Sequence, residues 1–92
     1  MKSAYELAME RLGGEVQKFT DEQKEQLADV DKIYDAKAAQ AKFDAKARLG
    51  KAAGDAEKQE QIRKDLATEL ASVESKRERE KEKLRKSFRE AN

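Results

Sequence analysis

The stretch Leu49–Asp55, LGKAAGD, decides how this chain folds. Long helix-forming segments lie on both sides of it, and the chain contains no proline that could break them elsewhere. Gly50 and Gly54 favour the backbone conformations that end a helix, and Asp55 is a preferred N-cap for a following helix. The stretch therefore predicts a short turn between two long helices that run in opposite directions.

The outer ends of these helices carry start and stop signals of their own. Thr20 with Gln23 three residues later is a capping-box pattern, and the acidic residues between them suit the positive end of a helix. These signals predict a helix over residues 20–49. Residues 55–89 contain no glycine, proline or asparagine and predict a second helix.

A shorter helix is expected near the start of the chain. A second capping-box pattern at residues 3–6 and the glycine pair at 13–14 predict a helix over residues 3–12. The predicted fold is therefore all-α: an antiparallel, coiled-coil-like helical hairpin of two long helices with a short N-terminal helix. We expect it to form a single domain over residues 1–92.

Apolar residues repeat along each long helix at a spacing that suits one narrow contact seam. In the first of the two helices the pattern repeats every eleven residues, which is typical of a nearly straight helix pair. A turn centred near Ala52 places Tyr34 opposite Leu70. At the open end we expect Phe19 and the short helix to cover Phe88. The predicted seam consists of Leu27, Val30, Tyr34, Ala38, Ala41, Ala45 and Leu49, facing Ile62, Leu66, Leu70 and Val73.

The composition favours helices held by paired charges over a thick globular core. Ala, Glu, Lys, Leu and Arg make up more than half of the chain, as in coiled coils and long helices. The 21 cations nearly balance the 20 anions, which argues against a disordered chain of high net charge. Cysteine and histidine are both absent, which excludes disulfides, thiolate nucleophiles, the usual zinc sites and histidine-based catalysis. The apolar runs are too short for a membrane-spanning helix.

The segment Glu74–Glu90, ESKREREKEKLRKSFRE, is interpreted as the solvated end of the second long helix. Opposite charges recur three or four residues apart along it, and such pairs stabilise a helix. The interleaved glutamates argue against a nucleic-acid site, because they repel a phosphate backbone. A basic arm and a disordered tail are the alternatives. The expected pairs are Glu74–Arg77, Glu78–Lys81, Glu80–Lys83, Glu82–Arg85 and Glu82–Lys86, and the alternative anion contacts are Lys76, Arg77, Arg79, Lys83, Arg85, Lys86 and Arg89.

The first long helix has a second apolar side, nearly opposite its seam. The second long helix has only the weak pair Ala67 and Ala71 in a comparable position. A helix that is apolar on two opposite sides is usually buried between two partners. We expect this side to pack against a second copy of the chain, in a four-helix antiparallel assembly, or against another protein; simple exposure is the alternative. Its residues are Ile33, Ala36, Ala39, Phe43 and Ala47.

Neither a catalytic site nor a cofactor is predicted. Asp29, Asp31 and Asp35 lie close together beside Glu25, but the turning glycine and the ligand spacing of a calcium loop are missing. We interpret them as a solvated acidic patch. The glycines lack the Lys-Ser/Thr of a phosphate loop, and no hydroxyl has a histidine to activate it. We therefore expect no metal, no small-molecule substrate and no enzymatic activity.

The segments KSAYELAMERL (residues 2–12) and TDEQKEQLADVDKIYDAK (residues 20–37) resemble a set of small bacterial proteins of unknown function that are themselves predicted to be helical hairpins. The charged second long helix agrees with this likeness. The resemblance implies a helical fold and a bacterial, cytoplasmic setting. It implies no activity and no functional residues.

Taken together, the sequence favours a non-enzymatic structural or protein–protein interaction module that acts through helix–helix packing. We expect a protein partner or a homo-oligomer, preferably a dimer, in the cytoplasm. Binding of nucleic acid or another anionic surface through the second long helix is the alternative. Ionic strength separates the two, because phosphate contacts weaken steeply with salt and an apolar interface does not.

Overall fold

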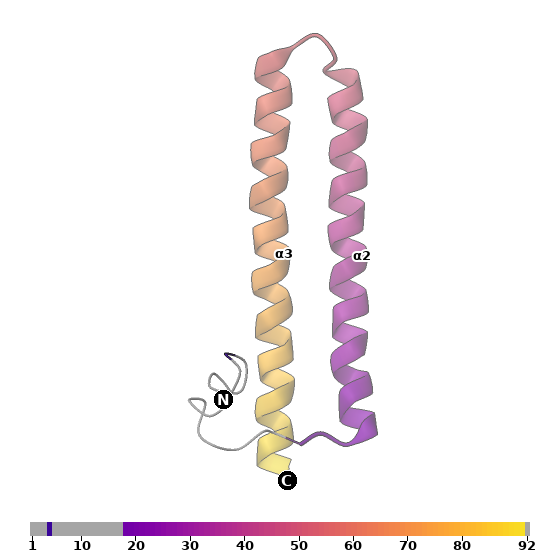
Figure 1. The fold of residues 1–92 in the computed structure, drawn as a ribbon, viewed down its shortest axis with the longest axis vertical. Helices are drawn as coiled ribbons and strands as arrows, with labels where there is room; N and C mark the ends of the chain where they lie inside the picture. Colours follow the sequence, from indigo (N-terminus) through magenta and orange to yellow (C-terminus); the bar gives the residue numbers. More distant parts are fainter. Residues whose placement is uncertain (1–3, 5–17, 92) are drawn as a thin grey trace.

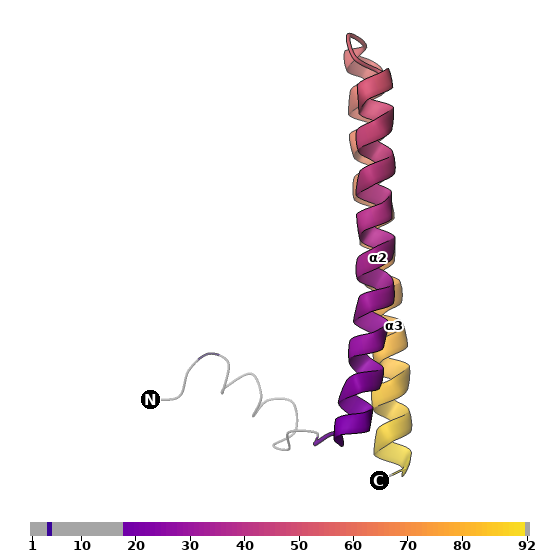
Figure 2. The same ribbon diagram turned by 90° about the vertical axis from the view of Figure 1, so that its right-hand side faces the viewer.

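A computed structural model describes Ala4 and residues 18–91, most of which lie in two long helices joined by a tight turn. Helix α2 spans Asp21–Lys51 and helix α3 spans Ala56–Ala91. The helices run side by side in opposite directions, so the end of α3 lies next to the start of α2 (Figure 1 and Figure 2). The all-α antiparallel hairpin is confirmed for this part of the chain. The short helix expected over residues 3–12 lies, apart from Ala4, outside the described residues.

Both helices begin at the caps that the sequence predicts. The hydroxyl of Thr20 accepts a hydrogen bond from the backbone N–H of Gln23 at 3.1 Å, and the Gln23 side chain accepts one from the backbone N–H of Thr20 at 3.0 Å. Asp55 Oδ1 accepts a hydrogen bond from the backbone N–H of Lys58 at 3.1 Å. These side chains satisfy N–H groups that have no partner inside a helix, so each cap stabilises the first turn.

The turn comes later than the sequence predicts. Gly50 is still helical, and α2 continues to Lys51 rather than ending at Leu49. Gly54 reverses the chain instead, with a φ of 88° that residues with a Cβ rarely adopt. The side chain of Gln59 closes the turn by donating a hydrogen bond to the carbonyl of Ala52 at 3.2 Å. Gly50 does not break α2, because a single glycine within a helix costs only about 1 kcal/mol relative to alanine, which is less than the surrounding helix contacts contribute.

The two helices meet along the predicted seam. Ala41, Ala45 and Val73 are buried, as is Ala52 in the turn. The small side chains allow the helices to approach closely near the turn. The remaining predicted seam residues are half-buried: Leu27, Val30, Tyr34, Ala38, Leu49, Ile62, Leu66 and Leu70.

Within residues 18–91, neither helix has an apolar segment long enough to cross a membrane.

An aromatic contact holds the open end of the hairpin together. The rings of Phe19 and Phe88 pack edge to face, with centroids 5.9 Å apart and an interplanar angle of 71°. Phe88 is buried, at 6% exposure. The expected packing of Phe19 against Phe88 is therefore confirmed.

The side-by-side pairing of the helices is shifted relative to the sequence prediction. Arg77 contacts Asp31 and Asp35, whereas a turn centred near Ala52, which had placed Tyr34 opposite Leu70, would put Leu27 opposite Arg77. Along the chain, the midpoint of Asp31 and Arg77 is Gly54. The shift follows from the extra helical residues at the end of α2.

The two glycines at the closed end provide a matched pair of variants. Gly50→Ala places a Cβ with no atom within 4 Å on a helical residue, so we expect the free energy of unfolding to rise by about 0.5–1 kcal/mol. Gly54→Ala also meets no atom within 4 Å, but it forces alanine into a positive φ, so we expect a loss of about 1–2 kcal/mol. Chemical denaturation measures both changes. Effects of the same sign would contradict this position of the turn.

Candidate functional site

A cluster of four charged residues, Asp31, Asp35, Arg77 and Lys81, interrupts the apolar seam. Arg77 and Lys81 continue the seam spacing of α3, so their side chains extend toward α2 and contact its aspartates. The side chain of Arg77 is 16% exposed and that of Lys81 is 17% exposed. We call this group the ion-pair cluster.

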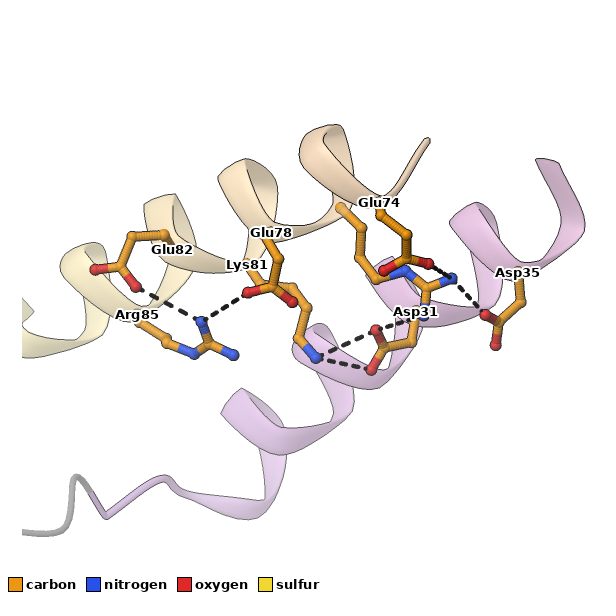
Figure 3. Close-up of polar contacts among 8 residues, drawn as sticks. Asp31, Asp35, Glu74, Glu78, Lys81, Glu82 and Arg85 are labelled. Carbon is orange, nitrogen blue, oxygen red and sulfur yellow. Dashed lines mark hydrogen bonds and ion pairs between the residues drawn. The ribbon is translucent and has the colours of Figure 1, made fainter. Parts of the chain in front are cut away.

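Asp31 lies between the two cations (Figure 3). Lys81 Nζ donates to Oδ2 and Oδ1 of Asp31 at 3.0 and 3.2 Å, and Arg77 Nη1 lies 3.5 Å from Oδ1. Arg77 Nη2 donates to Asp35 Oδ1 at 2.5 Å and lies 3.4 Å from Glu74 Oε1. The ion-pair cluster therefore connects two successive turns of α2 to two successive turns of α3.

Arg77 forms ion pairs with several carboxylates, but its Nε makes no hydrogen bond within the described residues. The hydrogen bond to Asp35 raises the pKa of its guanidinium, the charges of Asp35, Glu74 and Asp31 raise it further, and burial opposes them. Its Nε is buried and has no hydrogen-bond partner within the described residues. An unsatisfied buried donor costs stability. We therefore infer that the ion-pair cluster acts mainly by fixing which residues of α2 and α3 lie side by side.

The ion-pair cluster corrects two sequence-based expectations. The solvated acidic patch predicted around Asp29 is wrong for Asp31, whose side chain is only 37% exposed and pairs with α3, whereas Asp35 stays 67% exposed although it also pairs with Arg77. In the described ranges, no three carboxylates are grouped as metal ligands. Lys81 was expected to pair with Glu78, but its seam position directs it to Asp31. The seam spacing through Arg77 and Lys81 was the signal in the sequence.

Four of the seven predicted anion contacts are engaged with carboxylates, and three of these four are arginines. Arg77 faces α2, and both Arg85 and Arg89 lie against Glu82. Arg89 Nη2 donates to Glu82 Oε1 at 2.9 Å, and Arg85 Nη1 lies 3.6 Å from Oε2 and 3.8 Å from Glu78 Oε2. The hydrogen bond from Arg89, followed by that from Arg85, lowers the pKa of Glu82 against the opposing effect of burial. These three arginines are therefore poorly placed to bind an external anion.

Lys83 and the three remaining predicted contacts, Lys76, Arg79 and Lys86, form an exposed basic stripe on α3. They are spaced three, four and three residues apart, which places them on one side of the helix. In the part of the chain that the structure describes, only Lys83 among them forms an ion pair, with Glu80 at 3.2 Å. The pair expected between Glu82 and Lys86 is absent from this part, whereas Glu74–Arg77, Glu80–Lys83 and Glu82–Arg85 are confirmed.

The outer face of α2, formed by Ile33, Ala36, Ala39, Phe43 and Ala47, is exposed along its length. Ile33 is 55% exposed and Phe43 is 71% exposed. Leaving side chains of this size in water forgoes about 1.5–3 kcal/mol each relative to full burial. Because the structure holds one chain, coverage of this face by a partner stays a prediction.

A shallow groove of about 310 Å³ runs along one side of the seam. The Lys37 ammonium lies 4.9 Å from the centroid of the Tyr34 ring in its wall. Its other lining residues include Asp44, Glu69 and Lys76, so cations and anions alternate around it. Such a mixed lining favours no single ligand charge, and we assign no ligand to the groove.

A double-mutant cycle tests the ion-pair cluster. Asp35→Asn and Arg77→Met, made singly and together, should show a favourable coupling in the free energy of unfolding that shrinks as salt is added. The exposed pair Glu60–Lys64, at 3.5 Å, is the matched control and should couple by only about 0.3–0.5 kcal/mol. Coupling at Asp35–Arg77 no larger than at the control would contradict a role in fixing the register.

No protein-family model, no curated protein and no solved structure matches this chain. What the hairpin can bind therefore has to be inferred from its own surfaces. Two of them are candidates: the outer face of α2 and the basic stripe of α3.

Proposed function

We propose that this chain is a non-enzymatic interaction module that binds a helical protein surface through the outer face of α2. One observation carries the proposal: Ile33 and Phe43 are 55% and 71% exposed on a helix whose opposite side is already packed against α3. A helix with two opposite apolar sides is usually buried on both. The side away from α3 is therefore the place where a partner gains most by binding.

The shape of this face suits another helix. Ile33 and Phe43 are ten residues apart, or about 15 Å along the helix axis, with alanines between them. Two large anchors separated by small side chains let a second helix come close while both anchors are covered.

The cysteine-free composition agrees with a reducing compartment, and we propose the cytoplasm as the setting.

Photo-crosslinking from within the face tests this function. Replacing Phe43 by p-benzoylphenylalanine keeps an aromatic group in place and should yield adducts of higher mass when the chain is irradiated in the cell that makes it. The same substitution at Thr68, an exposed residue of α3, is the control and should yield far fewer adducts. Equal yields at the two positions, or none at Phe43, would contradict binding through the outer face of α2.

The basic stripe supports a second candidate function, the binding of nucleic acid or another polyanion. Lys76, Arg79 and Lys86 are exposed and, within the described residues, form no ion pair, so their charges are available to phosphates. Glu80 and Glu82 flank the stripe and oppose such binding. We therefore rank this function second.

Salt dependence tests the second candidate. If the four cations of the stripe contact phosphates, the logarithm of the binding constant should fall with the logarithm of salt concentration with a slope of about −3 to −4. Lys76→Glu with Lys86→Glu should abolish binding. Lys24→Glu with Lys42→Glu makes the same change in net charge on α2 and should preserve most of it. A flat salt response would rule this function out.

A further inference from the structure

We propose that the partner of the outer face of α2 is a second copy of this chain, packed antiparallel across a two-fold axis. This inference rests on the proposed function and names its partner. The axis passes level with Ala38, midway between Ile33 and Phe43. The argument for it comes from the charges that flank the apolar residues.

The two ends of the outer face carry opposite charges. Four exposed acidic residues lie on this side of α2 in its first three turns: Asp21, Glu22, Glu25 and Asp29. The segment 46–51 at the other end holds two exposed cations near this side of the helix, Lys46 and Lys51, and no anion, whereas Arg48 lies toward the seam. The apolar residues lie between these ends, so the face runs from acidic through apolar to basic.

This gradient selects one orientation for a second copy. An antiparallel copy sets the acidic end of each α2 against the basic end of the other, so both contacts are attractive. A parallel copy sets acidic against acidic and basic against basic, and like charges in apposition are costly. The helix dipoles favour the same choice. The face is therefore complementary to itself, as a two-fold interface requires.

The apolar residues select the register. With the axis level with Ala38, Ile33 of each copy lies beside Phe43 of the other. The two-fold axis therefore produces two identical Ile33–Phe43 contacts, which together cover both exposed residues of both copies. Glu25 then comes level with Lys51, and the alanines near the axis let the helices approach closely. Sliding the copies by a helical turn in either direction separates Ile33 from Phe43: Ile33 then lies opposite Ala47 or Ala39, and Phe43 lies opposite Lys37 or Asp29.

Each α3 lies on the far side of its own α2 in this arrangement. The four helices form a row, with the two copies of α2 in the middle and the two copies of α3 outside. The ion-pair cluster sits inside each hairpin and is not disturbed. The basic stripes stay exposed on the outer helices, so association of this kind does not depend on them.

Association and orientation are measured separately. Sedimentation equilibrium over about 1 µM to 1 mM should show the chain passing from monomer to dimer. Phe43→Glu should raise the dimer dissociation constant by about tenfold or more, whereas Thr68→Glu on α3 should change it less than about twofold. Since Phe43 is 71% exposed, circular dichroism should show that the Phe43→Glu hairpin is as helical as the parent.

Single cysteines report the orientation cleanly, because the chain has none of its own. With a short bis-maleimide, Ala39→Cys should crosslink to itself. Glu25→Cys should crosslink only when mixed with Lys51→Cys. Efficient self-crosslinking of Glu25→Cys would indicate a parallel pair and overturn the proposal.

A chain that stays monomeric throughout would also overturn the proposal of a second copy. If p-benzoylphenylalanine at position 43 still captured a different protein in the cell, the proposed function would stand and only its partner would change. If neither association nor capture occurred, both would fail.

Discussion

The structure depends on one narrow contact between α2 and α3. Helices of this composition gain most of their stability from packing an apolar side and little from intrinsic propensity. Among the described residues, only Ala41, Ala45, Ala52, Val73 and Phe88 are buried, so the contact is thin. A thin seam tolerates sliding, and residues with strong directional preferences are needed to hold it in register.

The ion-pair cluster and the Phe19–Phe88 contact meet that need in different ways. Asp31 is shared by Arg77 and Lys81, so a slip of one helical turn would separate at least one cation from its carboxylate. The aromatic rings hold the open end, and the hydrogen bond from Gln59 to Ala52 holds the closed end. With its register fixed at three levels, the hairpin is a firm support on which the outer face of α2 is presented.

Much of this architecture could be predicted from residue spacing, because caps and seams are local or periodic features. Thr20, Asp55 and the alanine seam are of this kind. The prediction that Gly50 ends the first long helix is wrong, because sequence alone does not distinguish a glycine within a helix from a glycine in a turn. The turn is formed by Gly54, with its positive φ, and by the hydrogen bond from Gln59. Lys81 was misjudged because its local partner Glu78 competes with Asp31, which is distant in sequence but close in the hairpin. The exposure of Ile33 and Phe43 could be anticipated from periodicity, whereas the identity of any partner could not, because it depends on residues that this sequence does not contain.

The position of the open end has a mechanical consequence. Since α2 begins and α3 ends side by side, a force that draws these two ends apart loads the seam one turn at a time, starting at Phe19 and Phe88. Separation of this kind reaches the ion-pair cluster next and the buried alanines Ala41 and Ala45 last. Tension applied along the common axis, from the turn toward the two ends, would instead be carried by the backbone hydrogen bonds of both helices in parallel and would leave the seam unloaded, so the hairpin resists pulling far better in this direction.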